Sequence, residues 1–216
     1  MQKRILSTLF VALFIYTFTG CASKKEAQEY NKPAVYWYNK MIKQISNGQI
    51  DDADDTYTSL ESEHRNSPLL PSALMIIATS HMEEEEYQMA NYYFDEYLKK
   101  FGLKEDADYI RYLKIKSNFL AFKSEFREQE LLSKTLLETN EFIKLYPNSQ
   151  YIYVVKTIRS RLFMAKAIFD KEISELYERI DKPEAQAVYK QKASQSWKDL
   201  NNIEPINTPW YRAIFE

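Results

Sequence analysis

Two histidines are the side chains best suited to metal or proton-transfer chemistry in this chain of 216 residues. His64 has acidic neighbours, and His81 precedes four consecutive glutamates at positions 83–86. Histidine and carboxylate together can bind zinc, but neither histidine lies in a group with ligand spacing. A turn followed by the first turn of a helix explains the acidic run better, because carboxylates stabilise the positive end of the helix dipole. We therefore expect no metal at these positions.

Other catalytic signatures are missing from the sequence. It contains no Ser-His-Asp set, no phosphate-binding loop and no HExxH motif, and nothing singles out a catalytic carboxylate pair. The 29 basic and 31 acidic side chains give a formal charge of −2. This balance provides no basic excess that would attract nucleic acid or an anionic lipid surface. We therefore expect a protein that is not an enzyme, needs no cofactor and binds no nucleic acid.

The only cysteine, Cys21, ends a targeting signal. Lys3 and Arg4 form a basic tip, and an apolar run at 5–18 leads to Thr-Gly-Cys. The Phe-Thr-Gly-Cys sequence resembles the lipobox of bacterial lipoproteins, which implies that residues 1–20 are removed and that Cys21 carries a diacylglycerol and an N-acyl chain. An uncleaved anchor is one alternative, but the apolar run of about 14 residues is shorter than the roughly 20 of a spanning helix. A second alternative is an ordinary signal peptide with a cysteine nearby.

The segment after the cysteine indicates how the protein is held in the envelope. Three acyl chains exceed the two signals that stable anchoring requires, so we expect attachment to the membrane through lipid alone. Ala22 is not the aspartate that retains many lipoproteins at the inner membrane, which favours the outer membrane. Residues 21–32 are polar and end before Pro33, as expected of a flexible tether.

The rest of the chain has the composition of an all-helical body. It contains three glycines and 17 tyrosines, and apolar residues recur at helical spacing between turn signals such as Gly102 and Pro147. In the long seventh helix, an inward stripe should include Phe169, Ile173 and Ile180. The predicted helices span residues 34–45, 51–65, 72–82, 84–101, 106–122, 128–146, 149–180 and 184–200, the last with Ala193, Trp197 and Leu200 facing inward.

Two of these helices share a small-then-aromatic pattern. Ala53 and Ala90 lie 37 residues apart, and each is followed four residues later by an aromatic, Tyr57 or Phe94. A small residue lets two helices approach closely while the aromatic fills the space beside it, as in tetratricopeptide repeats, whose period is about 34 residues. A non-repeating helical domain is the alternative.

This pattern predicts an all-α fold of tetratricopeptide-like helical hairpins that form a short right-handed solenoid. The first two repeats should span residues 33–102. Repeats three and four, with a degenerate C-terminal extension, should span residues 103–216. In the third repeat, Thr135 and Thr139 replace the alanine and the aromatic.

Three stretches resemble the family of the outer-membrane protein assembly factor BamD, also called ComL. Residues 36–53 look like the family's opening repeat, and residues 68–101 look like its second repeat. The most specific stretch is Tyr-Pro-Asn-Ser-Gln-Tyr at 146–151, which is similar to the family's junction between the third and fourth repeats. The similarity covers roughly residues 20–180. After Arg179 an Asp-Lys-Pro insertion replaces the Arg-Gly turn usual in the family.

The resemblance implies a non-catalytic, lipid-anchored scaffold of the outer-membrane β-barrel assembly (BAM) complex that faces the periplasm. Its expected partners are unfolded barrel precursors, the periplasmic domains of a BamA-type insertase and other BAM lipoproteins. The alternative is another tetratricopeptide lipoprotein of the cell envelope, acting in peptidoglycan synthesis, in a pilus or secretion apparatus, or in gliding.

The abundant tyrosines suggest where a precursor binds. Most of them should be core residues, but helix neighbours differ by about 100° in direction, so an adjacent pair cannot both point inward. Tyrosine combines an apolar body with a polar tip, which suits a peptide-binding groove. We expect this groove in the first two repeats, lined by Tyr36, Tyr38, Tyr57, Tyr92 and Tyr93.

Overall fold

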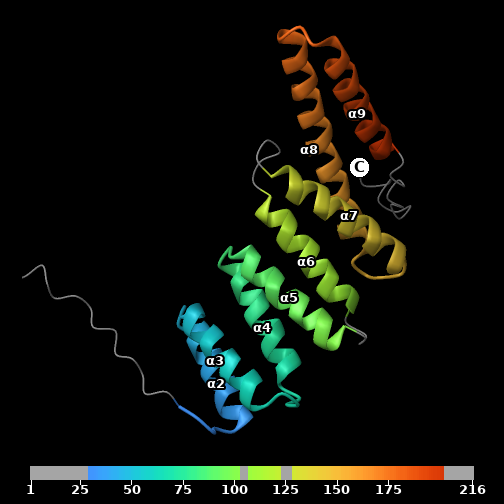
Figure 1. The fold of residues 1–216 in the computed structure, drawn as a ribbon. Helices are drawn as coiled ribbons and strands as arrows, with labels where there is room; N and C mark the ends of the chain where they lie inside the picture. The colour runs from blue at the N-terminus through green and yellow to red at the C-terminus, as the bar shows by residue number, and fades with distance from the viewer. Residues whose placement is uncertain (1–28, 103–106, 123–127, 202–216) are drawn as a thin grey trace, which may run out of the picture. The chain divides into compact units, whose positions relative to one another are not determined.

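The computed structural model describes residues 29–102, 107–122 and 128–201, with the last three residues described by their backbone alone. The chain divides into two units between Lys32 and Pro33, and all helices of the described part lie in the second unit. They confirm the predicted all-α class, and no strand occurs among the described residues (Figure 1). The helices are α2 (Ala34–Ser46), α3 (Ile50–Glu63), α4 (Leu70–Glu83), α5 (Tyr87–Phe101), α6 (Ala107–Ala121), α7 (Gln129–Leu145), α8 (Ile152–Arg179) and α9 (Pro183–Asn201).

Consecutive helices pack together in chain order. The hairpins are α2 with α3, α4 with α5, α6 with α7, and α8 with α9. Each hairpin also packs on the next one, through α3 with α4, α5 with α6, and α7 with α8, and Figure 1 shows this succession. Such nearest-neighbour packing is that of a tetratricopeptide-like repeat array. In the part of the chain that the structure describes, no helix is long and apolar enough to cross a membrane.

Glycine ends two of the helices for different reasons. Gly48, between α2 and α3, has φ 72, a left-handed conformation that costs glycine nothing. Gly102, after α5, has an ordinary negative φ, but a Cβ there would lie 2.1 Å from the carbonyl oxygen of Leu98. The tight ending of α5 therefore excludes every larger residue at position 102.

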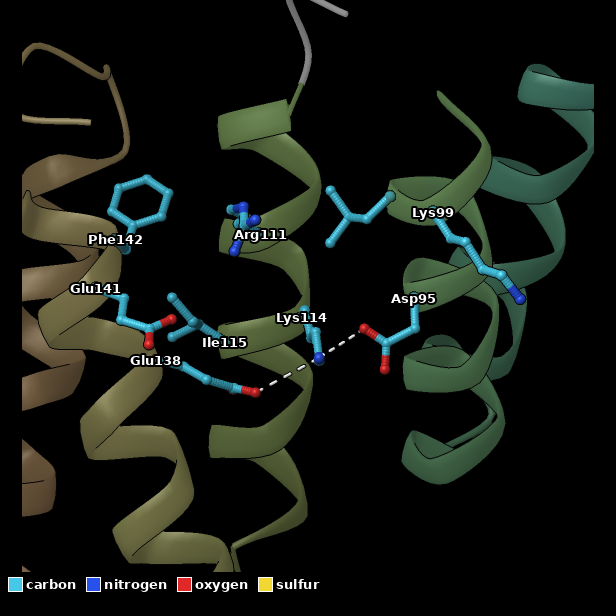
Figure 2. A pocket seen from close by; sticks show the side chains of 9 residues that line it. Asp95, Lys99, Arg111, Lys114, Ile115, Glu138, Glu141 and Phe142 are labelled. Carbon is cyan, nitrogen blue, oxygen red and sulfur yellow. Dashed lines mark hydrogen bonds and ion pairs between the residues drawn. The ribbon is translucent and has the colours of Figure 1, made fainter. Parts of the chain in front are cut away.

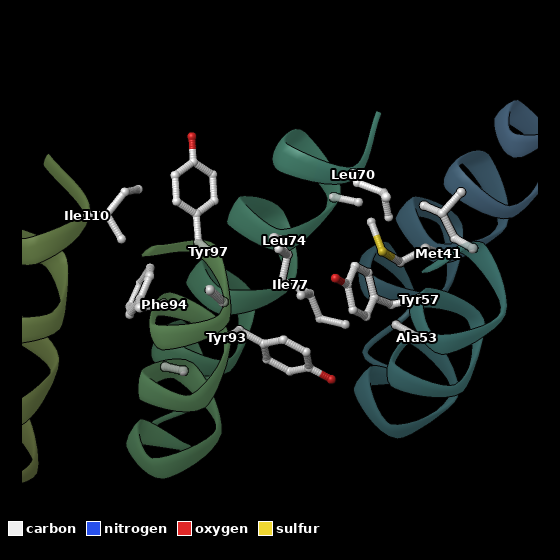
Figure 3. Packing of buried hydrophobic residues seen from close by; sticks show 14 of the residues in the cluster. Met41, Ala53, Tyr57, Leu70, Leu74, Ile77, Tyr93, Phe94, Tyr97 and Ile110 are labelled. Atoms are coloured by element: carbon white, nitrogen blue, oxygen red, sulfur yellow. The ribbon is translucent and has the colours of Figure 1, made fainter. Parts of the chain in front are cut away.

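The first four helices and the start of α6 share one hydrophobic core (Figure 3). Ala53 and Ala90 are fully buried in it, and the aromatic four residues after each, Tyr57 or Phe94, is buried as well. These four residues therefore form the predicted small-then-aromatic packing in hairpins one and two. Leu74 and Ile77 of α4 lie between the two helices that carry the pattern.

A second core joins α6, α7 and α8. Thr135 and Thr139 are both fully buried there, in place of an alanine and an aromatic. Their hydroxyl groups donate to the carbonyl oxygens of Leu131 and Leu136, at 2.7 Å and 2.8 Å. Because each hydroxyl bonds within its own helix, α7 can bury these polar side chains without a partner from another helix.

The sequence-based stripe of α8 is wrong in the second half of this helix. Phe169 and Ile173 are half-buried and Ile180 is exposed, whereas α8 instead buries Asp170 and Ser174. The Ser174 hydroxyl donates to the Gln186 carbonyl of α9 at 3.2 Å, so α9 packs on this polar side of α8.

The same packing corrects the prediction for α9. Ala193 is buried as expected, but Trp197 is 47% exposed, and the side chain of Leu200 lies outside the described residues. Asp170 is buried in this hairpin, and Lys166 on the same helix holds its carboxylate at 2.6 Å. Small and polar side chains, this local ion pair and the stacked rings of Tyr177 and Tyr189 join α8 and α9.

Candidate binding site

Of the five tyrosines proposed for the groove, three are at least partly exposed and two are buried. Tyr36 and Tyr92 are 37% and 56% exposed, and Tyr38 is half-buried. Tyr57 and Tyr93 are 3% and 5% exposed, so they belong to the core and offer no surface to a ligand. The neighbours on α5 thus differ in exposure, although their rings meet edge to face with centroids 5.2 Å apart, and the groove prediction rests on the other three tyrosines.

The burial of Tyr57 and Tyr93 has a chemical consequence. Burial, followed by the nearby Glu61 and Glu96, raises the pKa of Tyr57, whose hydroxyl is buried without a hydrogen-bond partner. Burial also raises the pKa of Tyr93, whose hydroxyl donates to Oδ1 of Asp54 at 2.7 Å. Both phenols therefore remain neutral, as core residues must.

His81 is a buried side chain that joins two carboxylates, a contact that we call the His81 junction. It is 1% exposed, stacks on Tyr93 with ring centroids 5.4 Å apart, and contacts Asp54 through Nε2 and Glu86 through Nδ1. The acidic run also differs from expectation, because α5 begins only at Tyr87. The residues before it form a turn in which Glu85 has φ 61. The carboxylate of Glu86 therefore meets the histidine, and it does not cap the helix.

The Tyr-Pro-Asn-Ser-Gln-Tyr stretch forms the corner between α7 and α8. The Ser149 hydroxyl donates to Asp108 at 2.6 Å, and the ring of Tyr151 stacks on that of Tyr112 with centroids 4.6 Å apart. The ring of Tyr109 also stacks on that of Tyr151, with centroids 5.2 Å apart. The motif therefore fixes the start of α8 against α6, which is a structural role.

A partly open pocket of about 360 Å³ lies between α5, α6 and α7 (Figure 2). The sequence had not indicated this site, because its lining comes from three helices. Leu98, Ile115 and Phe142 supply its apolar surface, and the latter two are almost fully buried. Its charged side chains are Asp95 and Lys99 from α5, Arg111 and Lys114 from α6, and Glu138 and Glu141 from α7.

The cations of this pocket differ in their partners. Lys114 holds Asp95 at 2.6 Å and Glu138 at 3.5 Å, so it ties α6 to both neighbouring helices. Arg111, one turn earlier on α6, has a buried Nε without a hydrogen-bond partner. Within the described ranges, no carboxylate forms an ion pair with Arg111. The i, i+3, i+4 spacing of Arg111, Lys114 and Ile115 was the sequence signal for one shared helix face.

No group of three or more His, Cys, Asp or Glu side chains within residues 29–102, 107–122 and 128–201 is arranged to hold a metal ion. Cys21, the predicted lipid attachment site, lies outside these residues.

The fold and these surfaces define a tetratricopeptide-like helical-repeat protein, a class that presents surfaces to other polypeptides. The family model described as "YfiO: Outer membrane lipoprotein" matches residues 30–203. The chain belongs to this family, that of the outer-membrane lipoprotein BamD.

The chain is also similar to one curated protein and to one solved structure. The outer membrane protein assembly factor BamD of Helicobacter pylori (strain ATCC 700392 / 26695) is 37% identical over 216 residues, which cover 99% of this chain and 98% of the relative. A solved structure described as "MamA RS-1 ArsTM double mutant" has a TM-score of 0.41 at 12% identity and covers 81% of this chain and 100% of its own.

Proposed function

We propose that this protein is a non-catalytic, lipid-anchored scaffold of the outer-membrane β-barrel assembly complex. It binds unfolded barrel precursors on its first two hairpins, and its later helices bind the periplasmic domains of a BamA-type insertase. Its contribution is to raise the local concentration of the two partners and to restrict their orientation, without bond chemistry. The lipid on Cys21 keeps this encounter at the periplasmic face of the outer membrane.

The observation that carries this proposal is family membership across residues 30–203, together with 37% identity to a BamD protein along nearly the whole chain. The exposed aromatic surface supports precursor binding. Tyr36 on α2 and Tyr92 on α5 present their rings to solvent, and Tyr38, two residues after Tyr36, is half-buried. An unfolded barrel strand alternates apolar and polar side chains, so aromatic rings with polar tips suit it.

Exposed apolar side chains on α8 support a separate insertase contact. Tyr153 is 70% exposed, and Val154, Met164 and Ile168 are 43–46% exposed. Because α9 packs on the polar side of α8, these residues remain available to a partner. Apolar surface of this kind is typical of protein-binding faces.

Photo-crosslinking in cells tests both contacts on the intact lipoprotein. A photoreactive residue at Tyr92 should label unfolded barrel precursors, and one at Tyr153 should label the insertase. Lys171, which is 66% exposed on α8, provides the control position. If Tyr92 and Tyr153 label only the proteins that Lys171 labels, the proposed function is wrong. Labelling of peptidoglycan enzymes or secretion components would instead identify a different envelope scaffold.

A further inference from the structure

The His81 junction makes one contact more than a neutral histidine can satisfy. Nε2 lies 2.9 Å from Oδ1 of Asp54, and Nδ1 lies 2.6 Å from Oε2 of Glu86. Each contact needs a hydrogen between the nitrogen and the oxygen, because two facing lone pairs repel each other. An ionised carboxylate supplies no hydrogen, and a neutral imidazole supplies one. The junction therefore requires one additional proton.

The contact with Asp54 uses the single hydrogen of a neutral ring. The hydroxyl of Tyr93 donates to the same oxygen, Oδ1, at 2.7 Å, and burial, followed by this hydrogen bond, raises the pKa of Tyr93. The phenol therefore keeps its hydrogen, and Asp54 is the acceptor for both neighbouring rings. Nε2 of His81 then donates to Asp54, which leaves Nδ1 of a neutral ring with only a lone pair towards Glu86.

The turn before α5 holds Glu86 against this second nitrogen. The backbone N–H of Glu86 donates to the carbonyl oxygen of His81 at 2.8 Å, and Glu85 in the same turn has a left-handed φ of 61. The 2.6 Å between Nδ1 and Oε2 is as short as a charge-assisted hydrogen bond. The additional proton therefore lies in this contact, and the ring carries it because imidazole is a stronger base than a carboxylate.

The groups that surround the ring favour a positive charge there. They are Asp54 from α3, Glu86 from the turn, and Tyr93 from α5, whose ring stacks on that of His81. Among the described residues, no lysine or arginine forms an ion pair with Asp54 or Glu86. Burial by itself disfavours a charged ring, but two carboxylates that each accept a hydrogen bond from it offset that cost.

We propose that the His81 junction is a pH-sensitive contact between the first two hairpins. An imidazolium ring joins α3 to the second hairpin, and this contact weakens when the ring loses its second proton. The ring of Tyr92 lies 5.2 Å from that of Tyr93, so the junction is one ring away from the exposed aromatic surface. The inference goes beyond the proposed function and does not depend on it.

The direction of the pH dependence follows from the number of bound protons. Histidine in an unfolded chain loses its second proton at about pH 6.5, and the folded junction retains this proton to higher pH. Above that pH the folded state binds more protons than the unfolded state, so stability falls as the pH rises. A difference of one proton lowers the folding equilibrium constant by at most about tenfold for each pH unit.

Urea unfolding of the full-length lipoprotein in detergent tests the proposal. Between about pH 6.5 and about pH 7.5, the folding equilibrium constant of the wild type should fall about three- to tenfold. Glu86→Gln should remove most of this fall, because an amide N–H donates to the lone pair of Nδ1 and no additional proton is needed. The matched control is Glu84→Gln, a change at an exposed acid of the same turn, which should keep the pH dependence of the wild type.

Nuclear magnetic resonance of the ring nitrogens is a second measurement, and it leaves the junction unchanged. His64 is the only other histidine in the sequence, so His64→Gln assigns the two sets of signals in protein labelled at histidine. At about pH 7 both ring nitrogens of His81 should carry a hydrogen. A neutral His81 ring at this pH, a wild-type stability that does not fall between the two pH values, or an equal fall in Glu86→Gln would each overturn the proposal.

Discussion

Nε2 of His81 lies 2.9 Å from Oδ1 of Asp54, although 27 positions separate the two residues. The other ring nitrogen lies 2.6 Å from Oε2 of Glu86. A carboxylate only accepts hydrogen bonds, and a neutral imidazole donates only one. Both contacts are therefore full hydrogen bonds only when both ring nitrogens carry a hydrogen. This buried junction links α3 of the first hairpin to the α4–α5 turn of the second.

Replacing the histidine should weaken the contact between these hairpins. We expect His81→Leu to lower the free energy of unfolding by about 1–3 kcal/mol, because it removes the contacts of a buried ring with the carboxylates of Asp54 and Glu86. Urea unfolding followed by circular dichroism measures this loss. Glu84→Gln, a change at an exposed acid of the same turn, should be nearly neutral. Equal stability of His81→Leu and the wild type would show that the junction contributes nothing.

Lys100 should make part of the stability depend on pH. It lies 2.7 Å from Glu96 on its own helix, and this hydrogen bond lowers the pKa of Glu96 against the opposing effect of burial. A carboxylate whose pKa is lower in the folded state contributes stability above its unfolded pKa, and the contribution is lost as the pH falls through the folded value.

Lys100→Met should therefore cost about 0.2–1 kcal/mol at neutral pH, and the cost should shrink towards about pH 3. Urea unfolding of the wild type and the variant at both pH values measures this change. Lys99→Met is the control, because Lys99 is 76% exposed and lies 3.5 Å from the same carboxylate. A cost that is constant with pH would mean that the bond to Glu96 is not its source.

Ala90 should tolerate no larger side chain. It is fully buried in the second hairpin, so Ala90→Leu should overpack the core and cost about 1–3 kcal/mol in unfolding free energy. Thermal or urea unfolding provides the measurement. The adjacent Met89 is 38% exposed, and Met89→Leu should have little effect. Similar losses in the two variants would point to an effect of α5 as a whole, and not of close packing at Ala90.

Cys21→Ala should abolish lipid attachment. The variant should remain in the periplasm or stall in the inner membrane, because the two-signal requirement for stable anchoring is no longer met. Partitioning between detergent and aqueous phases measures the change, and Ser23→Ala serves as the control. Unchanged recovery of Cys21→Ala in the detergent phase would refute the lipoprotein prediction.

Local pattern was enough to predict the helices and the first core. Apolar spacing and breaker residues placed all eight helices of the described part to within a few residues, and the Ala53 and Ala90 pattern predicted the packing of two hairpins. Helix periodicity and steric fit at a small residue are properties of neighbouring positions, so they are visible in sequence. The stretch at 146–151 likewise marked a real corner of the fold.

Contacts between distant positions were decided only by the tertiary structure. The sequence alone determined the all-helical class and the repeat pattern, and the targeting signal that ends at Cys21 stays a prediction from sequence. It did not determine that α9 packs on the polar side of α8, that His81 contacts two carboxylates, or that Nε of Arg111 is buried without a hydrogen-bond partner among the described residues. Periodicity states which residues share a helix face, whereas the helix that covers that face depends on the packing of the whole chain.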